Sequence, residues 1–337
     1  MRIGSLPNEV KGRPRAVHVI ILDGTLSSLE PLHQTNAGRS YTLLREMGSA
    51  VSLYYEPGLQ WRNWRSIRDV AMGKGINRQI RRAYGWLASR YRIGDQIFLF
   101  GYSRGAYAVR SLAGVIDRIG LLRSEAATVR NIRAAYRHYE ADPEAPAARA
   151  FATAHCHSQV EIEMIGVWDT VKSLGLNAPV LWRLSAHLHA FHNHDLSPVV
   201  KSGFHALAHD ETRMAFAPVL WTSEDGYEGR LEQVWFPGAH GDVGGQLGGF
   251  EAARPLANIP LVWMLERAAE HGLALPEGWA DRMPQDPLAP ARGTLRGHGK
   301  VLMTRRRRNI GADPSERLHE SIALRQGIEG LRNMSEV

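Results

Sequence analysis

The sequence predicts an α/β protein with a mostly parallel central sheet, helices on both faces and one helical insertion. Short apolar runs of strand length alternate with longer stretches in which apolar residues recur at helical spacing. Glycine-rich turns that carry polar side chains follow several of the apolar runs. With 44% hydrophobic and 22% charged residues among 337, the chain has the composition of a globular domain, which excludes intrinsic disorder and a coiled coil.

Four elements are predicted in the first hundred residues. The run VHVIIL is almost continuously apolar and is closed by Asp-Gly, as expected of a buried strand. A second short strand ends at Pro-Gly, and a third follows a Gly-Asp break. Between these two, apolar residues recur at helical spacing with arginines on the other face. The predicted strands are Val17–Leu22, Val51–Tyr55 and Gln96–Phe100, and the helix lies between Ile76 and Tyr91.

The rest of the chain continues this alternation. A helix that is apolar on nearly all sides is predicted over 105–119 and a second helix over 124–139. Strands follow at Val160–Trp168 and Leu231–Phe236. In a doubly wound sheet of this kind, reactive residues lie in loops beyond the carboxyl ends of the strands. We expect one domain over 16–325, with short tails at 1–15 and 326–337.

Composition excludes some classes and leaves others open. The chain contains no run of about 18 apolar residues that a membrane helix needs, and its single cysteine excludes an internal disulfide framework. The N-terminus lacks an apolar signal region, so we expect a cytoplasmic protein or one exported without a cleavable signal peptide. A net charge of +7 permits attraction to anionic lipid surfaces or nucleic acid without choosing between them.

The third strand leads into Gly101-Tyr102-Ser103-Arg104-Gly105, a G-x-S-x-G pattern between a strand and a helix. This context is typical of a nucleophile elbow, in which the serine lies in a strained turn. The two glycines allow the strand and the helix to approach closely. The serine hydroxyl is then exposed near a helix N-terminus, where backbone N–H groups stabilise an oxyanion. The pattern predicts Ser103 as a nucleophile.

A serine nucleophile needs a general base and a carboxylate that orients the base. Asp169 follows the strand that ends in GVW, and His240 lies in the glycine-rich loop after the last clear strand. The chain order Ser103, Asp169, His240 is common in sheets of this topology. Asp242 is the alternative orienting acid, although we expect it to support its own glycine-rich loop through hydrogen bonds to backbone N–H groups.

The first strand ends in Asp23-Gly24-Thr25. In haloacid-dehalogenase phosphatases the motif D-x-D-G-T supplies an aspartate nucleophile, but here Ile21 stands at the position of that aspartate, which excludes this class. In a hydrolase sheet the loop lies beside the elbow. We therefore expect it to provide one oxyanion N–H group and Arg104 to provide the other.

Several stretches in the same order resemble the catalytic domain of the type VI secretion phospholipase effector family, an α/β-hydrolase group. They span roughly 16–325 and read ILDGT, YRIGDQIFLFGYSRGAYAVRSLAGVI, GVWDTV, HALAHDETRMAFAPVLW, QVWFPGAHGDVGG, PLVWMLERAAEHGL and ERLHESIALR. The resemblance implies an α/β-hydrolase fold, a Ser-Asp-His triad and lipid esterase activity that in some members is antibacterial. It implies no metal or organic cofactor.

The preferred function is therefore hydrolysis of carboxylic esters, with phospholipid or a related acyl lipid as substrate. Two alternatives remain: an intracellular esterase or thioesterase without an antibacterial role, and a non-catalytic binding module of the same fold. The expected partners are the acyl-ester substrate, an anionic membrane contacted peripherally, and an immunity or secretion protein. Nucleic acid is not an expected partner.

Three further features of the sequence bear on function. His205 and His209 are four apart on an expected helix, a spacing that zinc sites use, but the H-E-x-x-H glutamate is absent, and we expect no metal site. The segment 174–200, rich in histidine and apolar residues, is either a cap over the site or a plain structural insertion. The run Arg305–Arg308 is expected to be solvated surface.

Overall fold

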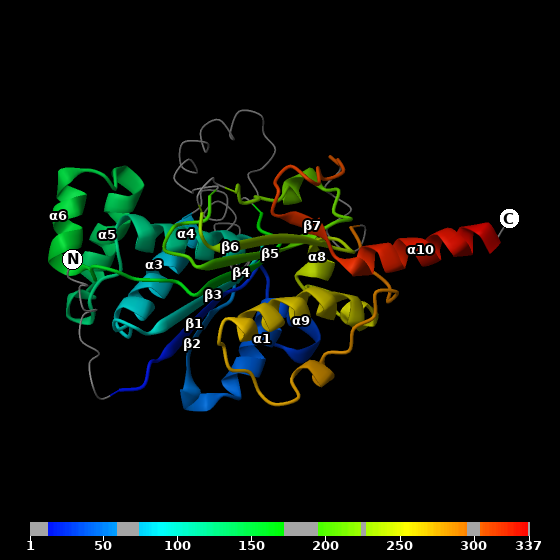
Figure 1. Ribbon diagram of the computed structural model, residues 1–337, viewed down its shortest axis with the longest axis horizontal. Helices are drawn as coiled ribbons and strands as arrows, with labels where there is room; N and C mark the ends of the chain where they lie inside the picture. Colours follow the sequence, from blue (N-terminus) through cyan, green and yellow to red (C-terminus); the bar gives the residue numbers. More distant parts are fainter. Residues whose placement is uncertain (1–12, 59–73, 172–194, 224–226, 295–303, 336–337) are drawn as a thin grey trace, which may run out of the picture.

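A computed structural model describes the chain except for 1–12, 59–73, 172–194, 224–226, 295–303 and 336–337 (Figure 1). Its centre is a sheet of seven strands in the order β2-β1-β3-β4-β5-β6-β7, and every pairing between neighbours is parallel. The strands are β1 (Val17–Leu22), β2 (Val51–Glu56), β3 (Gln96–Tyr102), β4 (Met164–Trp168), β5 (Ser202–Ala208), β6 (Arg230–Phe236) and β7 (Glu316–Leu318).

Helices cover both faces of the sheet, so the chain has the predicted α/β-hydrolase-like architecture. One layer contains α3 (Lys74–Ala88), α4 (Arg104–Arg118), α5 (Val129–Ala141) and α6 (Pro146–His155), and the other contains α1 (Asn36–Arg45) and α9 (Arg254–Glu270) (Figure 1). Alternate strand residues serve the two layers: Ile20 packs with the α3–α4 side, whereas Ile21 packs with the α1–α9 side. The central strands are buried on both faces, which explains their continuous apolar runs.

Most predicted elements lie within a few residues of their observed bounds, and Val17–Leu22 is reproduced without change. The strand expected from Val160 begins at Met164, and the helix expected over 124–139 begins as a 3-10 turn followed by α5. The helix expected around His205 is wrong, because His205 lies on β5. All seven β5 residues are buried, and its Ser, Gly and Ala residues lack the β-branched signal of a strand.

The C-terminal part of the chain completes the sheet. Strand β7 pairs with β6 and is followed by α10 (Glu320–Ser335), which extends away from the sheet (Figure 1). The expected domain end at residue 325 therefore falls inside a helix. None of the helices in the described ranges is both long and apolar enough to cross a membrane.

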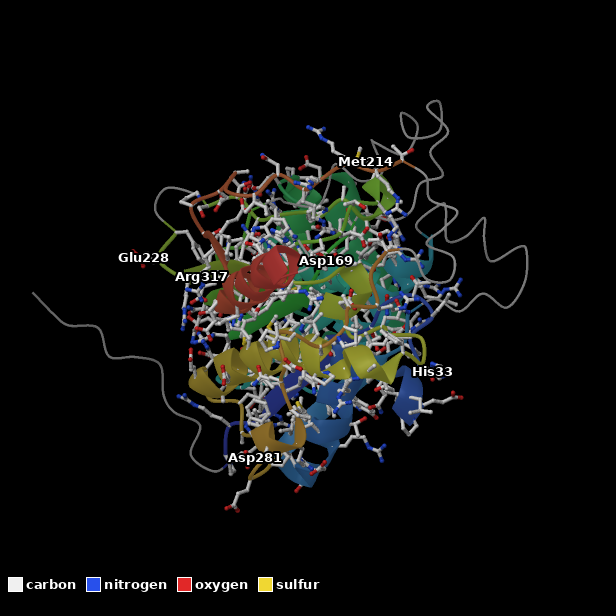
Figure 2. The ribbon with its side chains drawn as sticks, turned by 90° about the vertical axis from the view of Figure 1, so that its right-hand side faces the viewer. His33, Asp169, Met214, Glu228, Asp281 and Arg317 are labelled. Carbon is white, nitrogen blue, oxygen red and sulfur yellow. The ribbon has the colours of Figure 1, made fainter. Side chains whose placement is uncertain are left out.

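Because all strands are parallel, the residues that follow their carboxyl ends gather at one edge of the sheet. Leu22 is in register with Gly101, and Tyr102 with Trp168, so Asp23, Ser103 and Asp169 all emerge at this edge. Figure 2 views the molecule from the side at which α10 ends and labels Asp169 near the middle of that view. The expected cap, 174–200, lies almost entirely outside the described residues.

Candidate active site

Ser103 lies in the sharp turn between β3 and α4. Its φ of 56° and ψ of −118° form a strained conformation for a residue other than glycine. The turn is held by a 3.0 Å hydrogen bond from the Ser103 N–H to the Trp168 carbonyl. A Cβ at Gly101 would lie 2.6 Å from Ala106 Cα, and one at Gly105 would lie 2.0 Å from the Leu22 carbonyl oxygen. Both glycines are therefore required by close packing, as the pattern predicted.

His240 lies at the start of the short helix α8 (His240–Val243), after β6. Its ring is 3% exposed and packs between Tyr102 and Phe216, with ring centroids 4.9 and 4.6 Å away. Its backbone N–H donates to Glu211 Oε2 at 3.1 Å. The packing fixes the plane of the imidazole, and Nε2 lies 2.9 Å from Ser103 Oγ.

Asp169 completes this arrangement from the end of β4. Its side chain is fully buried, and Oδ2 lies 2.5 Å from Nδ1 of His240. Oδ1 accepts a 3.0 Å hydrogen bond from the N–H of Ala208. The structure therefore brings Ser103, His240 and Asp169 together in one line of hydrogen bonds, from residues separated by up to 137 positions in the sequence.

A fourth side chain, which sequence reasoning missed, contacts Asp169. Arg308 donates from Nη1 to Oδ1 at 2.5 Å and from Nη2 to Oδ2 at 2.9 Å. Burial opposes ionisation of Asp169, but the Arg308 cation and the hydrogen bond with His240 hold the pKa of the carboxyl well below its ordinary value. The expectation that the whole arginine run is solvated is wrong for Arg308, whose side chain is 4% exposed.

The carboxylate of Asp242 accepts backbone N–H groups, and its hydrogen bonds within the described ranges do not include one with the His240 ring. Oδ1 accepts the N–H of Arg292 at 2.6 Å, and Oδ2 accepts those of Ala239 at 2.9 Å and Gly293 at 3.1 Å. All three of these donors are backbone groups of the His240 turn and of a facing segment. The geometry suits a loop support rather than an orienting acid.

The loop after β1 lies against the serine turn, because a Cβ at Gly24 would lie 3.4 Å from Ser103 Cβ. The carboxylate of Asp23 accepts the Gly24 N–H at 2.6 Å and the Thr35 hydroxyl at 2.7 and 2.9 Å. Burial raises the pKa of Asp23 from 3.8 to about 6, although these hydrogen bonds and one from Tyr55 oppose the rise.

The N–H groups of this loop differ in their availability. Those of Asp23 and Gly24 are occupied by the Glu56 carbonyl and by the Asp23 carboxylate, respectively. Within the described ranges, the Thr25 N–H donates to no acceptor, and its buried hydroxyl has no partner either. Of the expected oxyanion donors on this loop, Thr25 is the one whose N–H has no acceptor among the described residues.

Arg104, directly after the serine, is 5% exposed, and neither Nη1 nor Nη2 has a hydrogen-bond partner among the described residues. Burial lowers the pKa of its guanidinium from 12.5 to about 10. Its backbone N–H also has no described acceptor, as expected for the first residue of a helix. That N–H is available to an anion at the serine turn.

The two histidines whose spacing zinc sites use, His205 and His209, have different partners. The buried His205 ring accepts the Thr170 N–H at 3.0 Å, and burial lowers its pKa to about 3, whereas His209 contacts Asp210. No group of three or more His, Cys, Asp or Glu in the described part of the chain is placed to hold a metal ion. The histidines of the segment 174–200 lie outside the described residues; they are His187, His189, His192 and His194.

Chemically, this site presents a hydroxyl hydrogen-bonded to an imidazole, an ionised carboxylate behind the imidazole, and backbone N–H groups beside the hydroxyl. These are the components that acyl transfer to a serine requires. Sequence analysis missed Phe216 and Glu211, which hold His240, although both lie in one of the stretches that carry the family resemblance. Nothing in the sequence distinguishes Arg308 from the arginines beside it.

Two solved structures are similar to this chain. An uncharacterized protein from Pseudomonas aeruginosa aligns with a TM-score of 0.47 at 16% identity, covering 81% of this chain and 50% of that chain. The Tle1 effector bound to the VgrG spike of the type 6 secretion system aligns with a TM-score of 0.33 at 20% identity, covering 73% of this chain and 55% of that chain.

Sequence comparison gives a relative and a family. Uncharacterized protein YEL023C of Saccharomyces cerevisiae is 26% identical over an alignment of 229 positions that covers 60% of this chain and 32% of the yeast protein. The chain thus spans about a third of the yeast protein and about half of each solved structure. The family described as "T6SS, Phospholipase effector Tle1-like, catalytic domain" matches residues 17–267. Because that match covers most of the chain, the protein belongs to the Tle1-like phospholipase effector family, within its catalytic domain.

Proposed function

We propose that this chain is a serine hydrolase that cleaves carboxylic esters of phospholipids or related acyl lipids through an acyl-enzyme on Ser103. The observation that carries the proposal is the continuous line of hydrogen bonds from Ser103 through His240 to Asp169. A serine hydroxyl on a buried imidazole with a carboxylate behind it is the arrangement that activates serine for acyl transfer.

In the first half of the proposed reaction, Ser103 Oγ attacks the acyl carbonyl and His240 Nε2 takes the hydroxyl proton. Asp169 holds the Nδ1–H of the ring and stabilises the imidazolium. The backbone N–H groups of Arg104 and Thr25 receive the negative oxygen of the tetrahedral intermediate. His240 then gives its proton to the leaving alcohol, which departs. In the second half, water loses a proton to His240 and attacks the acyl-enzyme. The bond between the acyl group and Ser103 Oγ then breaks, His240 returns its proton to Oγ, and the carboxylic acid is released.

A lipid substrate is supported by the family and by the surface beside the site. The segment that follows Gly24 carries three exposed leucines: Leu26 is 47% exposed, Leu29 37% and Leu32 62%. These apolar side chains follow directly on the loop that contacts Ser103, so they suit contact with a lipid surface. The net charge of +7 favours adsorption to anionic lipid.

The serine assignment is tested with Ser103→Ala, using Ser111→Ala as the matched control because Ser111 is a buried serine on α4 whose hydroxyl donates to the carbonyl of Tyr107. Losing the nucleophile should reduce hydrolysis of p-nitrophenyl butyrate by about 10⁴-fold or more and abolish labelling by a fluorophosphonate. The control should retain both. Wild-type turnover in a folded Ser103→Ala protein would overturn the assignment. Absence of labelling in the wild type would favour the binding-module alternative.

The substrate class is tested by comparing dispersed short-chain ester with vesicles of anionic and of zwitterionic phospholipid. We expect the highest rate on anionic vesicles, with a decline as salt shortens the screening length to about 3 Å at 1 M. Leu29→Ser should lower the vesicle rate more than the dispersed-ester rate. Equal, salt-insensitive rates on all three substrates would instead favour an intracellular esterase or thioesterase.

A further inference from the structure

We propose that Arg308 is a positioning residue of this active site: its guanidinium fixes the carboxylate of Asp169 that orients His240. The inference rests on the proposed function of Ser103. It also extends the active unit along the chain, because the family match ends at residue 267 and Arg308 lies 41 residues beyond that point.

The side chains of Arg308 and Asp169 form a bidentate contact. Nη1 and Nη2 each donate to a different oxygen of Asp169, an arrangement that fixes the carboxylate plane as well as its charge. Only arginine presents this planar fork. With both oxygens held, Asp169 cannot rotate away from His240 Nδ1.

The guanidinium itself is held by the structure around the triad. Nη1 also donates to the carbonyl of Ala208 at 2.8 Å, and Nη2 to that of Phe216 at 2.7 Å. Ala208 is the last residue of β5, and the ring of Phe216 packs on His240. Arg308 therefore links the orienting acid to the two segments that border it.

The other arginines of the run do not share this role. Arg305 reaches Thr212 and Thr294 on the surface, and the side chains of Arg306 and Arg307 are exposed. All four arginines of the run are charged, but of the four it is Arg308 that is buried against Asp169.

The electrostatic surroundings of Asp169 make Arg308 the largest contribution that favours its ionised form. The carboxylate is fully buried, and burial alone raises the pKa of an aspartate. Its other titratable neighbours are His240, to which it is bonded, His205, whose pKa is lowered by burial, and Tyr102, whose pKa is raised by burial. Glu211 faces His240 but is paired with Arg213. Among the described residues, Arg308 supplies the cation that touches Asp169.

A purely structural anchor would behave differently from a positioning residue. Loss of an anchor lowers the amount of folded protein and its melting temperature, and the remaining active sites keep the wild-type pH dependence. Loss of the cation that faces Asp169 raises the pKa of this carboxyl, so protonation removes the orienting charge at a higher pH. The acid side of the activity profile must then move upward.

The test uses the full chain with Arg308→Gln, Arg308→Lys and the control Arg307→Gln, which removes the same charge from an exposed neighbour. Turnover of p-nitrophenyl butyrate is divided by the fraction of sites that a fluorophosphonate titrates, and is measured across pH. We expect Arg308→Gln to lose about 10²-fold in turnover per site. Its acid limb should move up by at least about one pH unit.

Arg308→Lys should recover part of both effects, because lysine restores the charge without the fork. Arg307→Gln should match the wild type. If turnover per site and the acid limb of both Arg308 variants equal those of the wild type, the inference is wrong while the proposed function stands. If Arg308→Gln does not fold, the turnover per site of Arg308→Lys decides alone: wild-type turnover in this variant, which keeps the charge but lacks the fork, overturns the proposal. A wild type that neither labels nor hydrolyses ester defeats the proposed function itself.

Discussion

Two aspartates flank Ser103 at the carboxyl ends of β1 and β4, and both are almost completely buried: Asp23 is 1% exposed and Asp169 0%. Their partners differ. Asp23 is held by hydroxyl and backbone donors, and burial raises its pKa to about 6. Asp169 faces Arg308, and its pKa is held well below the ordinary value.

The difference teaches that the kind of partner decides the direction in which the pKa of a buried carboxyl at this edge is shifted. Hydroxyl and backbone donors offset only part of the desolvation at Asp23, whereas the Arg308 cation and the hydrogen bond with His240 together outweigh it at Asp169. An acid that orients a histidine must remain charged while the histidine gains a proton. The lowered pKa of Asp169 keeps its carboxyl ionised to a lower pH than the raised pKa of Asp23 allows, which suits the proposed role of Asp169.

The largest expected effect comes from Asp169→Asn. Turnover should fall about 10⁴-fold, because asparagine favours the wrong tautomer of His240. The variant should also lose about 3–5 kcal/mol of stability, because Arg308 is left buried without its anion. Adding Arg308→Gln should recover much of the melting temperature and none of the activity. If the double variant is as unstable as Asp169→Asn, the unpaired Arg308 is not the cause of the lost stability.

The contribution of Asp23 to stability should depend on pH in the direction opposite to that of Asp169. Its pKa is 3.8 in the unfolded chain and about 6 in the folded one, so its contribution is complete below 3.8 and is lost as pH rises through about 6. This difference corresponds to about 3 kcal/mol. Asp23→Asn should therefore raise the melting temperature relative to the wild type at pH about 8 more than at pH about 4. A constant difference between the two proteins across this range would contradict the raised pKa.

Asp169 gives the reverse sign: because its folded pKa is depressed, its contribution is present above 3.8 and is lost as pH falls below that value.

Asp242→Asn should affect stability more than catalysis. One of its two oxygens is replaced by an amide, so at least one of the three backbone donors loses its acceptor, at a cost of about 1–3 kcal/mol. Turnover should fall far less than in Asp169→Asn, as measured on samples of equal active-site titre. A collapse of activity in Asp242→Asn, with Asp169→Asn still active, would reassign the orienting acid.

The smallest effect is expected from Tyr55→Phe. The Tyr55 hydroxyl donates to Asp23 Oδ2 at 2.7 Å, and its loss should lower stability by about 1 kcal/mol at pH about 8. The loss should be smaller at pH about 4, where Asp23 is protonated. Tyr54→Phe is the matched control, because that hydroxyl bonds to Glu56 instead. If the loss of stability depends on pH equally in the two variants, the contribution of the Tyr55 hydroxyl does not depend on the charge of Asp23.

Sequence reasoning reached five of the seven strands, all but β5 and β7, and the three residues of the hydrogen-bonded line, because each depends on local pattern. VHVIIL has one stable role, a strand buried on both faces, and the loops that follow such strands meet at one edge whatever the details of packing. His205 was misplaced because spacing of four suits a helix, whereas only pairing between β4 and β6 shows that its segment is a strand.

By itself, the sequence determined the sheet class, the strained serine turn with its two obligatory glycines, and the chain order of serine, aspartate and histidine. These follow from backbone sterics and from hydrophobic periodicity, which act over a few residues. Only the tertiary structure decided which of four adjacent arginines is buried against Asp169, and that the pKa of Asp23 is raised whereas that of Asp169 is lowered. Charge state depends on desolvation and on partners brought from more than a hundred residues away, and such contacts leave no local pattern in the chain.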